Sequence, residues 1–197
     1  MAVLSALVIE VQAGATSWII GESHWSKAQQ ESVYWLERYL GSADPADLQA
    51  ACRALEVPLG DRAARLAVDA SPIDWAEVYA GLAAGRNARE DMPQMVRLYR
   101  YGQRLPYLGS AIALWKHTDG DILHLSLLAD RAASAQATGT PDARALQSLR
   151  AELHLLDGRM RRDAAQFLTL LTRCARMLHD VMAVSYTHLR AHETRGN

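Results

Sequence analysis

Apolar residues recur every three or four positions through most of the chain, and this spacing predicts α-helices. The most regular stripe follows the turn signal Gly139-Thr140-Pro141, in which Thr140 is the expected N-cap and Pro141 the first helical residue. From there the spacing predicts one helix over residues 141–183, about 65 Å long. Its apolar positions are Leu146, Leu149, Leu153, Leu156, Met160, Ala164, Phe167, Leu171, Cys174, Leu178 and Val181.

Two further stretches have helical spacing. The first runs from Thr16 to Leu40, and Gly41 is the expected left-handed cap at its end. The second covers residues 106–138, and the polar stretch at 118–121 could kink or break it. Because a tight turn joins this second helix to the helix over 141–183, the two should be antiparallel. Chain direction then puts Thr16 and Ala183 at the same end of the molecule.

Turn and cap signals divide the region between these long helices into short ones. Asp44-Pro45 is the expected start of the first, with Asp44 as N-cap, and Pro58 and Gly60 are the expected interruption after it. Ser71-Pro72 is expected to open another short helix. The predicted helices are 46–55, 61–68, 71–84 and 88–101, with a turn at 85–87.

These elements together predict an all-α fold. We expect an elongated up-down helical bundle, with a cluster of short helices inserted between the first and the last two long helices. The composition agrees, because Phe occurs once in 197 residues and the apolar residues are mostly Ala and Leu, which are good helix formers. The predicted domain covers residues 21–183.

Both ends of the chain are expected to differ from this domain. Residues 1–20 are either an ordinary helix start or the outer half of a transmembrane helix, with Trp18 near the membrane–water boundary. Residues 184–197 have no periodicity and resemble a translated sequencing adapter, so we expect a non-native tail. His188 and His192 in this tail have a metal-ligand spacing on a helix, but a non-native segment predicts no metal site.

Charge and motifs exclude several function classes. Lys and Arg total 21 against 22 Asp and Glu, so nothing favours nucleic acid as a partner. No phosphate loop, nucleophile elbow or zinc-protease motif occurs, and we predict no catalytic residue, metal or cofactor. Cys52 and Cys174 are expected to be independent buried thiols unless the fold brings them together.

Two stretches combine aromatic and polar residues, at 21–39 and 85–100, and could line a small-ligand pocket. In such a pocket an arginine could pair with a ligand carboxylate through two hydrogen bonds. The alternative left open is that the aromatic residues are bundle core and the arginines are solvated. The candidate ligand-binding residues are Trp25, Lys27, Gln29, Arg38, Arg86, Asn87, Arg97 and Arg100.

Three segments carry a resemblance to a known kind of protein: GESHWSKAQQESVYWLERYL, VPLGDRAARLAVD, and the stretch from GLAAGRNAREDMPQ to HLSLLA. They resemble the N-terminal sensory region of bacterial membrane signalling proteins, which lies between two transmembrane helices. The motifs WSKAQ (25–29) and VPLGDR (57–62) are the most specific. The resemblance covers residues 21–181 and includes both GGDEF/EAL proteins and hybrid sensor histidine kinases.

The resemblance implies a periplasmic segment of an inner-membrane protein that responds to an unknown small-molecule or protein stimulus. It implies membrane attachment through transmembrane helices that this sequence lacks, and a cytoplasmic output domain that is a cyclic-di-GMP enzyme or a histidine kinase. The segment itself would then have no enzymatic activity. Such domains usually act as pairs, so a homodimer is also expected.

Two other function classes stay open. A soluble helical scaffold or interaction domain would need Met1 to be the true start and the leading apolar residues to pack on the bundle. A small all-α enzyme is the third class, but no set of titratable residues converges in the motifs.

Overall fold

The computed structural model of the chain describes residues 2–137 and 142–193, and the side chains of residues 9–137, 142–177, 179 and 180. This part of the chain forms six α-helices and no β-strand, which confirms the all-α prediction. The helices are α1 (Ala2–Ser42), α2 (Pro45–Asp69), α3 (Trp75–Ala84), α4 (Met92–Gly102), α5 (Leu108–Gln136) and α6 (Ala143–Glu193).

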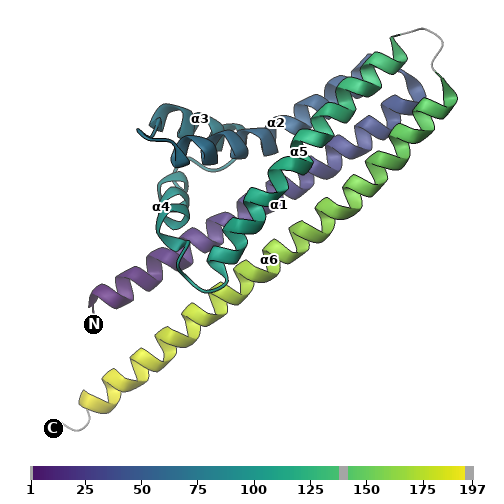
Figure 1. Ribbon diagram of the computed structural model, residues 1–197. Helices are drawn as coiled ribbons and strands as arrows, with labels where there is room; N and C mark the ends of the chain where they lie inside the picture. The colour runs from purple at the N-terminus through teal and green to yellow at the C-terminus, as the bar shows by residue number, and fades with distance from the viewer. Residues whose placement is uncertain (1, 138–141, 194–197) are drawn as a thin grey trace.

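Three long helices form an elongated bundle, and α3 and α4 lie to one side of it (Figure 1). α1, α5 and α6 pack against one another, while α2 packs on α1, α3 and α5. The start of α1 and the end of α6 lie at the same end of the molecule in Figure 1, as the chain direction predicts. No helix within the described residues contains a segment long and apolar enough to cross a membrane.

The turn between α1 and α2 begins later than the sequence predicts. Gly41 is inside α1, and the residue with a left-handed backbone is Ala43, at φ 55°. The Ser42 hydroxyl holds this connection, because it donates to Asp47 Oδ2 (2.8 Å) and accepts from the Asp44 amide (3.1 Å). Asp44 caps α2 as predicted, accepting a hydrogen bond from the Ala46 amide at 2.9 Å.

α2 is one continuous helix, so the prediction of two short helices separated at Pro58 and Gly60 is wrong. A proline inside a helix costs about 3 kcal/mol, but α2 is buried against α1 and α3 along much of its length, and Pro58 is part of that buried face. Gly60 lies where α3 crosses α2: a Cβ atom there would come within 2.8 Å of the Gly81 carbonyl oxygen. Its small size therefore serves helix packing rather than a turn.

The helices after α2 begin later than predicted, but the turn between them is correct. α3 starts at Trp75 because Asp74 caps it, accepting a hydrogen bond from the Glu77 amide at 3.1 Å. α3 ends at Ala84 as expected, and a turn follows at residues 85–87. α4 then begins at Met92, four residues after the predicted start.

α5 runs through the polar stretch at residues 118–121 without a break. Thr118 Oγ1 donates to the Trp115 carbonyl oxygen at 2.8 Å, so its hydroxyl is satisfied within the helix. Asp119 is paired with Arg65 of α2, and the Arg62 Nε atom lies 3.4 Å from the same carboxylate. These contacts between helices hold the polar stretch in helical form.

α6 confirms the prediction of a long continuous helix. Thr140 and Pro141, its expected start, lie outside the described residues, as do the side chains of Leu178, Val181, His188 and His192. The stripe faces the bundle: its buried members are Leu149, Leu153, Leu156, Met160, Leu171 and Cys174.

Trp18 is a core residue. Its side chain is 4% exposed, its ring centroid lies 5.7 Å from that of Trp115, and its indole N–H donates to the Met95 carbonyl oxygen at 3.3 Å. Together with Phe167 of α6, on which the Trp18 ring stacks, helices α4 and α5 therefore enclose it. A tryptophan at a membrane–water boundary lies on the surface of the protein, whereas Trp18 is buried.

Candidate functional site

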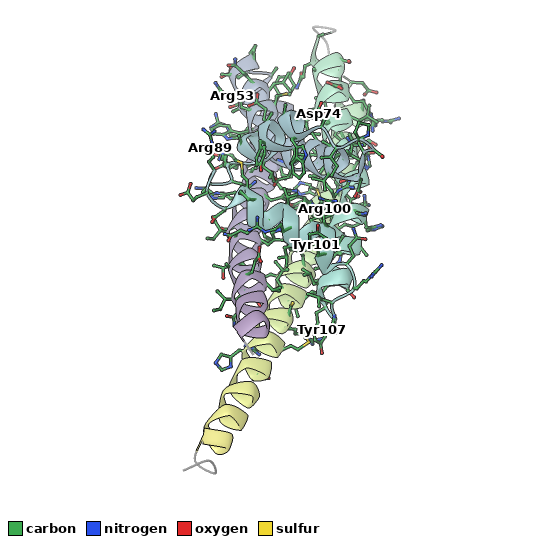
Figure 2. The ribbon with its side chains drawn as sticks, turned by 90° about the vertical axis from the view of Figure 1, so that its left-hand side faces the viewer. Arg53, Asp74, Arg89, Arg100, Tyr101 and Tyr107 are labelled. Atoms are coloured by element: carbon green, nitrogen blue, oxygen red, sulfur yellow. The ribbon has the colours of Figure 1, made fainter. Side chains whose placement is uncertain are left out.

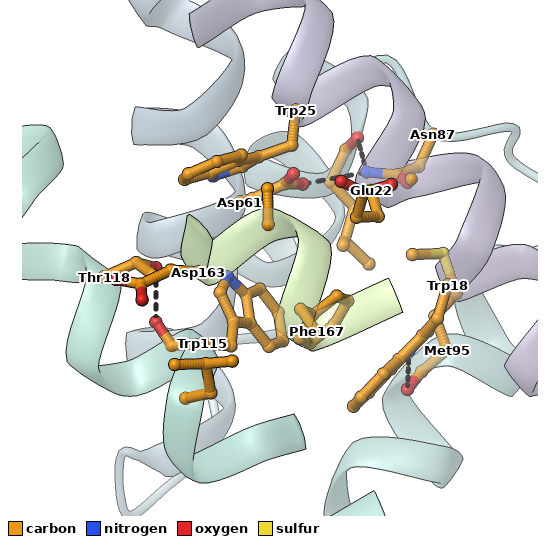
Figure 3. A pocket seen from close by; sticks show the side chains of 14 residues that line it. Trp18, Glu22, Trp25, Asp61, Asn87, Met95, Trp115, Thr118, Asp163 and Phe167 are labelled. Carbon is orange, nitrogen blue, oxygen red and sulfur yellow. Dashed lines mark hydrogen bonds between the residues drawn. The ribbon is translucent and has the colours of Figure 1, made fainter. Parts of the chain in front are cut away.

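A cavity lies where α6 meets α1, α5 and the inserted helices, and it is partly open to solvent (Figure 3). The centre of a water molecule can move through about 60 Å³ of it. Because one water needs roughly 10–15 Å³ on this measure, the cavity has room for several waters or a small ligand.

Four aromatic side chains line the cavity: Trp18, Trp25, Trp115 and Phe167. The Trp18 ring meets Trp115 edge-on and stacks on Phe167, with ring centroids 6.3 Å apart in the stacked pair. These rings come from α1, α5 and α6. Trp18, Trp115 and Phe167 fix one another's positions, so this part of the wall is built before any ligand arrives.

Asp61 is the most deeply buried carboxyl group of the cavity. Its side chain, from α2, is 6% exposed, and Asn87 Nδ2 donates to its Oδ1 at 2.9 Å. Burial raises the pKa of Asp61 well above its usual value, and the hydrogen bond from Asn87 opposes this only in part. Gly85 makes room for the carboxylate, since a Cβ atom there would collide with Oδ1.

Two more carboxyl groups line the cavity, Glu22 of α1 and Asp163 of α6. Glu22 accepts a hydrogen bond from the Ser26 hydroxyl one helical turn further along α1. Among the lining residues of the described part there is no Lys, Arg or His. The cavity is therefore apolar with acidic groups and carries no cationic side chain.

Of the eight predicted ligand-binding residues, Trp25 and Asn87 line this cavity. Gln29 is fully buried one turn beyond Trp25, and its amide donates to Asp157 Oδ1 at 2.9 Å. Lys27, between them on α1, is exposed. The helical period explains this split, because 25 and 29 share a face that 27 does not.

The arginines lie outside the cavity. Arg38 is over the Trp35 ring, with its guanidinium carbon 5.1 Å from the ring centroid. Arg86 is exposed in the turn after α3, at φ 60°, and Arg97 pairs with Glu10 near the start of α1. Arg100 is at the outer surface of α4, beside Tyr101 (Figure 2).

Met95 of α4 lines the cavity, so residues 97 and 100 lie on the opposite side of α4, which faces solvent. The cavity therefore offers a ligand carboxylate no guanidinium partner. Whether any of the eight residues binds a ligand stays a prediction.

The two cysteines are both free, and they differ in exposure. Cys174 is buried in α6 as expected, whereas Cys52 is exposed on α2, so the prediction of a buried thiol is wrong there. No group of three or more His, Cys, Asp or Glu side chains within the described residues is arranged to hold a metal ion.

Sequence reasoning missed Asp61, Glu22 and Asp163. Each is an acidic residue between small or polar neighbours on a helix, a pattern that usually marks a solvated face. The burial of Asp61 could have been recognised only with α2 as one helix, because residues 54, 57, 58, 61, 64 and 65 then form one buried face.

Comparison with known proteins adds no relative: no family model, no curated protein and no solved structure matches this chain. The function is therefore inferred from the residues and their geometry.

Proposed function

We propose that the chain is the extracytoplasmic signal-input domain of a bacterial transmembrane signalling protein, and that a small molecule bound in the cavity is its stimulus. The output domain of that signalling protein would be a cyclic-di-GMP enzyme or a histidine kinase. The observation that carries the proposal is the position of the cavity, between α6 and the helices inserted after α1.

α6 is the element suited to transmit the signal. It contributes Asp163, Ala164 and Phe167 to the cavity and continues as one helix to Ala183, the last residue before the predicted non-native tail. A ligand that contacts α6 and the inserted helices together favours one relative position of the two. Because a continuous helix is stiff, a small shift or tilt at the cavity moves its far end as well.

The direction of the long helices is compatible with attachment to a single membrane. The start of α1 and the end of α6 lie at the same end of the molecule (Figure 1). Transmembrane helices that precede α1 and follow α6 would then enter the same bilayer. The homodimer and the periplasmic location are further parts of this proposal.

The first test is the sequence of the native gene around this segment. We expect about 20 mostly apolar residues beyond Ala183, followed by an output domain. A native stop codon, or a continuation with no apolar segment, would contradict the proposal and favour the soluble scaffold.

The second test measures ligand binding and its link to α6. Metabolites are screened by the thermal shift of the full chain, in which a ligand at about 100 times its Kd adds about 2.7 kcal/mol of stability. Ala164→Phe fills the cavity from α6 and should abolish the shift. Ala165→Phe, at the exposed neighbouring position, is the matched control and should keep it. Equal shifts in both variants would remove the cavity from the proposal.

A further inference from the structure

The cavity combines aromatic walls with acidic side chains, and this combination identifies a class of ligand. We propose that it binds a small organic cation through an ammonium head group that lies among the rings and next to Asp61. This inference deepens the proposed function, because it names the chemical class of the stimulus.

The aromatic side of the cavity suits a cation. Trp18, Trp25 and Trp115 all line it, and the face of a tryptophan ring attracts a positive charge more strongly than that of tyrosine or phenylalanine. Trp18 and Trp115 are held in place by edge-on packing at 5.7 Å, and Trp18 also by its hydrogen bond to Met95. Rings fixed in this way lose little freedom when a ligand binds.

The acidic side supplies the matching charge. Asp61 is more than nine-tenths buried, and within the described part of the chain its carboxylate accepts one hydrogen bond, from Asn87 to Oδ1. Oδ2 accepts no hydrogen bond from any described residue, which leaves it free for an N–H group or a nearby positive charge. An entering cation would provide the counter-charge that an ionised Asp61 lacks, with Glu22 and Asp163 lining the same space.

The basic residues nearest along the same helix do not fulfil that role. Arg65 is paired with Asp119 and Asp69, and Arg62 lies 3.4 Å from Asp119. Neither lines the cavity. An anionic ligand would meet three carboxyl groups and no cation, so the cavity selects against it.

The test uses ligands of one shape and three charges. The full chain is titrated with choline, with its neutral analogue 3,3-dimethylbutan-1-ol and with the 3,3-dimethylbutyrate anion. In both analogues a carbon atom replaces the ammonium nitrogen of choline. Ethanolamine is included as a smaller cation. Binding is followed by tryptophan fluorescence, since three of the five tryptophans line the cavity. At least one cation should bind about tenfold or more tightly than dimethylbutanol, and the anion should not bind.

Two variants locate the binding. Asp61→Asn keeps the shape of the side chain but cannot ionise to meet the cation, and should weaken cation binding about tenfold or more. Asp130→Asn makes the same substitution on the exposed face of α5 and should leave the affinity unchanged. Both variants are checked for an unaltered helical circular dichroism spectrum.

Three results would overturn the assignment of the ligand class: equal or tighter binding of the neutral or anionic analogue, equal affinity in Asp61→Asn and the parent, or no saturable response to either cation at about 10 mM. Each would leave the gene sequence and the Ala164→Phe comparison intact as tests of the proposed function.

Discussion

Helices α2 and α3 cross at two glycines, Gly60 and Gly81. Replacing Gly81 by alanine, with Gly120→Ala as the control, tests how closely the two helices cross. A Cβ atom on Gly81 would lie 2.6 Å from both the Gly60 carbonyl oxygen and the Ala64 amide nitrogen. Both are backbone atoms, so neither can rotate away. Gly120, inside α5, would place its Cβ in open space, with nothing within 4 Å.

The two substitutions to alanine should have opposite signs. Alanine inside a helix is favoured over glycine by up to about 1 kcal/mol, a gain available at both positions. At Gly81 the helices would have to separate by about 1 Å to restore ordinary contact distances, and overpacking of this kind costs about 1–3 kcal/mol. We expect Gly81→Ala to destabilise the protein by about 1–2 kcal/mol and Gly120→Ala to stabilise it by about 0.5–1 kcal/mol.

The assay is urea unfolding of the full chain, followed by circular dichroism, with melting temperature as a second measure. Since about 1 kcal/mol shifts the melting temperature of a chain of this size by about 2–4 °C, the two variants should differ by several degrees. Stabilisation by Gly81→Ala equal to that by Gly120→Ala would refute the close crossing of α2 and α3.

Three further predictions concern buried groups. Burial raises the pKa of Asp61, so this carboxyl group lowers the stability of the folded state as pH rises above the ordinary pKa value of 3.8. Asp61→Asn removes this cost and should therefore stabilise the protein more at about pH 7 than at about pH 4. An equal gain in stability at the two pH values would contradict this prediction. Iodoacetamide should modify exposed Cys52 before buried Cys174 in the folded protein, as mass spectrometry of digests would show, and equal rates would argue against the burial of α6 on the bundle. Arg65→Met removes the partner of the Asp119 carboxylate and should lower the free energy of unfolding, measured by urea unfolding, by about 3 kcal/mol. A loss below about 1 kcal/mol would show that water or Arg62 takes the place of Arg65.

The sequence by itself determined that the fold is all-α and where several of the helices begin or end. The spacing of Leu149, Leu153, Leu156 and Met160 predicts α6 because helical periodicity is a local property that one stretch of chain carries alone. The Asp44 cap is local in the same way, since its side chain bonds an amide two residues away.

Tertiary structure alone decided where helices continue and which side chains meet. Pro58 and Gly60 read locally as an interruption, yet burial against α1 and α3 outweighs the local cost of proline and makes the glycine a crossing point. The cavity is less accessible still to sequence reasoning, because Trp25, Asp61, Trp115 and Phe167 come from four different helices. Periodicity shows that each helix has a buried face, but which faces oppose one another, and what space they leave, follows from the packing of the whole chain.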